Sequence, residues 1–372
     1  MSSTRLGRPQ LYLSYGQDMA LLNTPAKRWW TLFLVLVAVL LPFMLQDDLL
    51  AVLATAFVAA IGAIGLNLVT GYAGQVSLGH AFFLGLGAYT AATLSGDPDS
   101  TRLIGFGITS FPIWLLASGL VAGLAGLIVA PLAARLRGLY LAVVTLGLVF
   151  IGEHLFKHWG DLTGGVGVGR PAAVPELFGI QFAVDGEFFT KAQKLYLLMF
   201  VLLVIFGVLA RNLVRSRIGR ALAAVRDRDL AAEVIGVDVT RYKMIAFAVS
   251  SFYAGVAGAL LYVMIGFVEP GSFNLALSVQ YIAMILVGGV ATISGSVLGA
   301  LFITLLPRVT RELPAVLPFI SSSSTSGGIT VFQVETILYG LLIIGFLIFE
   351  PRGLFGIWIR IRTYWKSWPF SH

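Results

Sequence analysis

Few side chains in this chain of 372 residues could carry out chemistry, and their pattern argues against a catalytic or metal site. Cysteine is absent and the four histidines are scattered, so no disulfide framework or thiolate site can form and a histidine metal cage is not expected. No GxxxxGK[ST] motif occurs, and the GGVGVG run at 164–169 lacks the strand and helix that a phosphate-binding loop needs. We therefore expect no metal and no cofactor bound by this chain.

One ionisable cluster could still take part in proton transfer. Glu153, His154 and His158 stand at helical spacing near the end of an apolar run and could form a relay, but an interfacial cap is the more ordinary role and the one we favour. A serine-protease site would pair Ser294 with one of these histidines. The glycine that a GxSG motif needs two positions earlier is Thr292, which argues against that interpretation.

The composition is that of a polytopic membrane protein, because 58% of the residues are apolar, 12% are charged and 42 are glycine. Apolar runs reach the ~20 residues that cross a bilayer. We expect an all-α inner-membrane helical bundle with short or broken helices near its pathway. The apolar runs lie at 29–45, 49–69, 78–95, 111–134, 138–156, 194–210, 244–267, 277–306 and 329–349.

The distribution of basic residues predicts the orientation. The loop 211–243 carries eight of the 25 Lys and Arg residues (Arg211, Arg215, Arg217, Arg220, Arg226, Arg228, Arg241 and Lys243), so it is expected in the cytoplasm. The run 277–306 is long for one crossing and is interrupted by GGVATISGS, residues 288–296; a hairpin there gives about ten membrane segments with both termini cytoplasmic.

The resulting domain plan has three parts. They are a polar cytoplasmic N-terminal segment (1–28), a transmembrane domain (29–350) with a cytoplasmic loop (211–243) and an external loop (157–193), and a basic cytoplasmic tail (351–372).

Two glycine-rich interruptions mark a candidate translocation pathway. Broken backbone at membrane depth is tolerated only where protein or a water-filled cavity satisfies it, and transporters often place such breaks at their pathway. Simple helix packing by small residues is the alternative. The candidate pathway residues are Gly74, Gln75, Ser77 and His80 in the first half and Gly288, Gly289 and Ser294 in the second.

The stretch RDRDLAAEVIGVDVTRYK, residues 226–243, is charged and helix-prone between apolar runs. We expect two helical pieces separated near Gly236, with Leu230, Val234 and Val237 on one face. Such a stretch could lie on the lipid surface, keep a long loop solvated or dock a soluble partner. Its small residues and mixed charges favour docking.

The chain resembles the permease subunits of ABC importers for branched-chain amino acids, and in particular the longer permease of the pair. The likeness extends from about residue 50 to the GLFG at 353–356. It is carried by four segments: GLNLVTGYAGQVSLGHAFFLGLGAYTAA (65–92), RLRGLYLAVVTLG (135–147), LTGG (162–165) and SRIGRALAAVRDRDLAAEVIGVDVTRYKMIAFAVSSFYAGVAGAL (216–260).

This resemblance implies a transporter subunit without catalysis of its own in a bacterial inner membrane. Its implied partners are a paralogous permease, two cytoplasmic ATPases that bind ATP and Mg, and an extracytoplasmic substrate-binding protein, with no nucleic acid. The implied ATPase-coupling residues are Arg226, Asp229, Ala231, Ala232, Glu233, Gly236 and Val237. Permeases for urea or amides share the family pattern, and a secondary transporter is a further alternative that the scarcity of charges within the apolar runs weakens.

Overall fold

A computed structural model describes residues 25–136, 138–177, 179–186, 188–311, 320–321 and 329–367. The chain divides into two units, Met1–Gln46 and Asp47–His372, which are described separately. In the first unit, α2 (Pro25–Leu40) is followed by the 3₁₀ turn η1 (Leu41–Phe43). The apolar side chains along α2 are mostly exposed, as expected of a helix in contact with lipid. Most of the predicted polar segment 1–28 lies outside the described residues.

The second unit is built almost entirely of helices. The core is formed by α3 (Asp47–Asn67), α4 (His80–Ser95), α5 (Phe111–Arg135) and α11 (Val239–Ile265). Helix α11 packs against the other three. The remaining helices are α6 (Leu139–His158), α7 (Gly160–Thr163), α8 (Lys191–Arg215), α9 (Arg217–Asp227), α10 (Asp229–Val234), α12 (Leu275–Gly288), α13 (Ile293–Arg311), α15 (Val331–Phe349) and α16 (Gly353–Ser367), with a 3₁₀ turn η3 (Pro270–Ser272).

The distribution of buried and exposed apolar side chains is that of a protein in lipid. Helix α3 is buried along most of its length, whereas α5, α6 and α8 keep apolar side chains such as Ile128, Ile151 and Val201 exposed. In water such faces would be driven together. Small residues fill the centre instead: Gly87 of α4 lies against the backbone of Gly255 in α11, where no Cβ would fit, which lets the two helix backbones approach closely.

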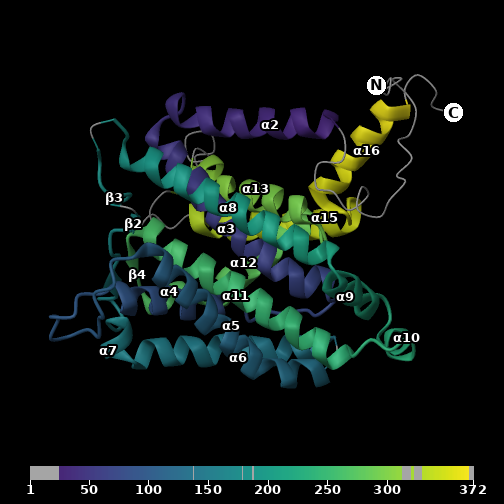
Figure 1. The fold of residues 1–372 in the computed structure, drawn as a ribbon, viewed down its shortest axis with the longest axis horizontal. Helices are drawn as coiled ribbons and strands as arrows, with labels where there is room; N and C mark the ends of the chain where they lie inside the picture. Colours follow the sequence, from purple (N-terminus) through teal and green to yellow (C-terminus); the bar gives the residue numbers. More distant parts are fainter. Residues whose placement is uncertain are drawn as a thin grey trace. The chain divides into compact units, whose positions relative to one another are not determined.

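The connections gather at the two ends of this helical unit (Figure 1). At one end, β1 (Arg170–Pro171) pairs antiparallel with β4 (Phe267–Val268), and β2 (Glu176–Leu177) pairs with β3 (Ile180–Gln181) near α7. At the other end lie α9 and α10. We call the end that holds β1 to β4 the strand end, and the end that holds α9 and α10 the α10 end. A further pair, β5 (Ile320–Ser321) and β6 (Ile329–Thr330), is parallel.

The predicted hairpin within 277–306 is confirmed as a helix break. Helix α12 ends at Gly288 and α13 begins at Ile293. The described residues contain seven helices long and apolar enough to cross a membrane, or up to eight if the bent pair Thr336–Phe349 and Gly353–Tyr364 is one span. Helices α2 and α4, with 16 residues each, are shorter than a usual complete crossing. The structure therefore shows a polytopic helical protein, and the number ten stays a prediction.

Candidate functional site

The first break lies where α3 runs into a π turn, η2 (Leu68–Tyr72), after which the chain is not helical until His80. Side chains satisfy the backbone that this break exposes. Thr145 Oγ1 accepts a hydrogen bond from Leu78 N at 2.9 Å, and Ser278 Oγ accepts one from Ala81 N at 3.0 Å. Buried N–H groups need such partners where water is absent. Side chains from other helices therefore stabilise the break in this fold.

The second break joins α12 to α13 through residues 289–292. Gly289 has φ 131° and Ala291 has φ 58°, both in the region that favours glycine. A non-glycine residue persists at such an angle only where the surrounding structure holds it. The hydrogen bond that holds Ala291 comes from a distant segment of the chain.

The side chain of Asn67 ties the two breaks together. Its Oδ1 accepts from Ala291 N at 2.8 Å, and its Nδ2 donates to Ser296 Oγ at 2.7 Å, to Thr292 O at 3.0 Å and, at the long limit of 3.4 Å, to Gly289 O. Asn67 is 1% exposed and precedes the π turn directly. The sequence interpretation missed it, although one amide near the end of the apolar run 49–69 was a visible signal.

The first-half pathway candidates follow the π turn in the non-helical segment that ends at His80. Gln75 is 4% exposed, and neither its Oε1 nor its Nε2 has a hydrogen-bond partner among the described residues. The Nε2 of His80 also has no hydrogen-bond partner in the described part of the chain, and the ring centroids of His80 and Tyr281 are 4.9 Å apart. Ser77 Oγ accepts from Gly79 N at 3.4 Å. Unpartnered buried polar atoms are costly, so Gln75 and His80 are suited to meet water or a polar solute.

The second-half candidates divide into two groups. Gly288 and Gly289 are buried at the junction, and Gly288 lies against the backbone of Gly295 in α13. Ser294 is exposed on the first turn of α13. The serine that joins the junction is Ser296, which is fully buried.

The segment 217–243 forms helices α9 and α10 and the first turn of α11. The predicted break near Gly236 is confirmed, because α10 ends at Val234, Gly236 has φ 85° and α11 begins at Val239. The structure adds a further break between α9 and α10 at Arg228, whose φ of −158° and ψ of 110° are not helical.

The apolar face of the loop differs from the predicted one. Ala232 is buried against Val225 and Val239, with Val237 packed beside them, while Leu230 and Val234 are 68% and 88% exposed. We call the exposed apolar residues Leu230, Val234 and Ile235 the α10 tip. Ala231, Glu233 and Gly236 are exposed next to it. An exposed apolar tip that no other described residue covers is typical of a docking surface.

An ion pair anchors α10 to the core helix α11. Lys243 Nζ lies 2.7 Å from Asp229 Oδ2, and the Lys243 side chain is only 6% exposed. Removing one partner of a buried pair costs about 3–5 kcal/mol because the other charge stays buried. The tip is therefore tied to α11 by a strong local contact.

Arg226 links the same loop to the first break. Its Nη1 donates to Gly71 O at 3.3 Å, its Nε and Nη2 bind Asp227 Oδ1, and its side chain packs on Gly74. Gly74 has φ 69°. A cavity of about 120 Å³ beside this contact is lined by Gln75, Arg226, Asp229 and Lys243 among others.

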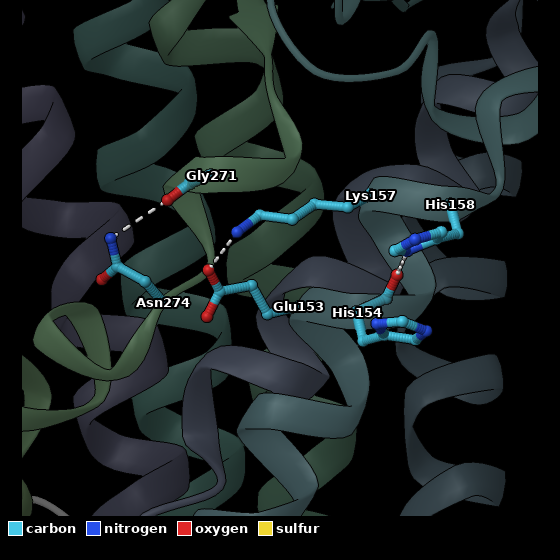
Figure 2. A network of polar contacts seen from close by, with 6 residues as sticks. All are labelled: Glu153, His154, Lys157, His158, Gly271 and Asn274. Carbon is cyan, nitrogen blue, oxygen red and sulfur yellow. Dashed lines mark hydrogen bonds and ion pairs between the residues drawn. The ribbon is translucent and has the colours of Figure 1, made fainter.

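The Glu153 cluster lies at the strand end. Glu153 Oε1 and Lys157 Nζ are 2.6 Å apart, and His158 Nδ1 lies 2.9 Å from the carbonyl of His154 (Figure 2). These contacts are made within α6, and both histidines are exposed. This geometry is that of a helix-end cap. Within the described residues, no cluster of three or more His, Asp or Glu side chains could hold a metal ion.

Long apolar helices, two helix breaks joined by one amide and a basic loop at 211–243 are the features of a multi-pass membrane protein of the solute-transporting kind. The family described as "Branched-chain amino acid transport system / permease component" matches residues 49–349. The chain belongs to this family and is thus a transporter subunit.

Individual relatives agree with the family match. The high-affinity branched-chain amino acid permease LivM of Salmonella typhimurium is 29% identical over 349 residues, covering 89% of this chain and 76% of LivM. BraD of Pseudomonas aeruginosa, with the same description, is 28% identical over 313 residues (80% and 91%). The ribose import permease RbsC of Haemophilus influenzae is 25% identical over 273 residues (70% and 76%). No solved structure matches the chain.

Replacing Asn67 by leucine should destabilise the protein by about 2–4 kcal/mol, because it leaves the Ala291 N–H without its acceptor and removes the amide donor to Thr292 O and Ser296 Oγ. The free energy of unfolding can be measured by SDS titration in mixed micelles. Asn212→Leu makes the same chemical change on an exposed position of α8 and should change stability by less than about 1 kcal/mol. Equal effects of the two variants would contradict the role of Asn67.

Proposed function

We propose that the chain is a permease subunit of an ATP-driven importer for leucine, isoleucine and valine in the bacterial inner membrane. It forms the pathway with a second, paralogous permease, and two cytoplasmic ATPases act on it while an external binding protein delivers the solute. The observation that carries this proposal is the α10 tip, an exposed apolar surface anchored to α11 by Asp229 and Lys243 and connected to the first break by Arg226.

The orientation follows from charge. The α10 end carries the basic cluster of residues 211–243, so it faces the cytoplasm by the positive-inside rule. The strand end then faces outward and receives the binding protein. An even number of crossings places both termini in the cytoplasm, including the basic helix α16.

The contacts suggest how ATP binding reaches the pathway. A displacement of the α10 tip by an ATPase is carried by the Asp229–Lys243 pair into α11 and by Arg226 into the Gly71 carbonyl. Gly71 belongs to the π turn that follows Asn67, and Asn67 holds the second break. Both breaks therefore move with the loop, which is what alternating access requires of a transporter with discontinuous helices.

The reconstituted importer, with its partner permease, ATPases and binding protein, should accumulate radiolabelled leucine in proteoliposomes only when ATP is supplied. Unlabelled isoleucine and valine should compete, whereas urea and ribose should not. Competition by urea or an amide would favour the alternative substrate class within this family. Leucine uptake that follows a proton or sodium gradient without ATP would contradict the importer assignment.

Val234→Glu should reduce ATPase recovery in an affinity purification from native membranes at least tenfold, because a charge placed in a buried apolar contact has no partner there. Val166→Glu, the same change at the strand end, should leave recovery unchanged. Both variants should reach the membrane in normal amounts. Full ATPase recovery with Val234→Glu would rule out docking at the α10 tip.

Arg226→Gln should leave the ATPase bound but lower leucine import roughly tenfold, within the usual range of coupling energies, since it removes the contact between α9 and the first break. Arg228→Gln, two residues further on and exposed, is the matched control and should import normally. The assay compares ATP-driven uptake with ATPase recovery for each variant. Normal import by Arg226→Gln would show that the coupling bypasses this side chain.

A further inference from the structure

A buried cation at the strand end has no anionic partner among the described residues. Arg170 of β1 is 3% exposed. Its Nη2 donates to Ala92 O at 2.8 Å and to Ile104 O at 2.9 Å, and its Nη1 donates to Leu162 O at 2.9 Å. Three carbonyl dipoles offset part of the cost of burying a guanidinium, but they do not supply the carboxylate that buried arginines usually have. Burial lowers the pKa of Arg170.

Arg170 lines a cavity of about 270 Å³ that opens beside it. This volume is close to the ~300 Å³ at the lower end of small-molecule sites, which suits a solute of amino-acid size. Arginine has five N–H donors, and the Nε hydrogen and the second Nη1 hydrogen have no acceptor among the described residues. They are the donors left for a carboxylate, which a guanidinium binds strongly.

The same cavity offers a negative charge and an apolar wall. Asp97 lines it and is exposed; one of its oxygens, Oδ1, accepts from Asp99 N at 3.0 Å. Leu103, Ala172 and Ala173 supply apolar surface. The hydroxyl of Tyr262 is engaged, because it donates to Pro171 O and accepts from Ala173 N, both at 3.0 Å. Cation, anion and apolar wall around one cavity are the features that distinguish a zwitterionic solute from urea or a sugar.

We propose that this cavity binds the zwitterion of an α-amino acid at the outer mouth of the permease, with the carboxylate on Arg170, the ammonium on Asp97 and the aliphatic side chain on Leu103. The assignment deepens the proposed function and rests on it for the outward orientation of the strand end. It gives the permease a receiving site for solute released by the binding protein.

Asp97→Asn is the sharpest test, because the amide oxygen can keep the bond to Asp99 N while the charge is lost. Arg170 itself is less suitable, since its substitution also breaks three carbonyl bonds. Leucine should be titrated by ligand-observed NMR into the detergent-purified complex of permeases and ATPases without binding protein. Asp97→Asn should weaken leucine binding at least about tenfold, as expected for the loss of one charge-assisted bond, and Asp99→Asn should not.

Two further measurements separate binding from folding. Leu103→Trp should fill the cavity and reduce leucine binding while leaving the unfolding temperature and ATPase recovery unchanged. The α-keto analogue of leucine, which lacks the ammonium group, should bind the wild type less well than leucine does, and Asp97→Asn should abolish that preference.

The outcomes also distinguish this inference from the proposed function. If the wild-type importer accumulates leucine but Asp97→Asn and Leu103→Trp bind it normally, the cavity assignment is wrong and the proposed function stands. If the wild type imports no amino acid at all, the proposed function is wrong whatever the cavity binds.

Discussion

The structure depends on one constraint: backbone that leaves helical geometry inside an apolar medium must find its hydrogen-bond partners within the protein. Asn67 meets this need at the second break, with one acceptor and two donor hydrogens in a single amide. A hydrocarbon side chain there would leave the Ala291 N–H without its acceptor. The two interruptions are therefore one structural unit, although more than 200 residues separate Asn67 from Ala291.

The loop of α9 and α10 is held by two contacts of different kinds, one to α11 and one to the first break. The Asp229–Lys243 pair is short and mostly buried, so it behaves as a rigid attachment to α11. Arg226 is more exposed and its bond to Gly71 is longer. The ion pair therefore fixes the loop on α11, while the weaker contact between Arg226 and Gly71 can break and re-form without detaching the loop.

Much of this arrangement could be predicted from sequence because it depends on local pattern. The interruption at 288–296 predicted the division of the 277–306 run, and the basic, helix-prone loop predicted α9 and α10. The break at Gly236 could be predicted because glycine favours positive φ, whereas the further break, at Arg228, has no glycine or proline to mark it and was not predicted. Asn67, Ser296 and the Arg170 cavity could not be derived, because their partners lie far away along the chain. Only the fold brings Asn67 within reach of Ser296, or Arg170 within reach of Ala92 and Ile104.

The π turn at the end of α3 holds one more residue per turn than the α-helix around it. An α-helix advances about 100° for each residue. The extra residue therefore determines in which direction around the axis of α3 the following segment, from Gly71 to His80, leaves the helix. If the turn relaxed to α geometry, that segment would rotate by one residue step about the axis of α3. The Gly71 carbonyl, which accepts from Arg226, and the side chain of Gln75 would then each face a different neighbour. The extra residue thus fixes the rotation of this segment at the point where Arg226 of α9 contacts it.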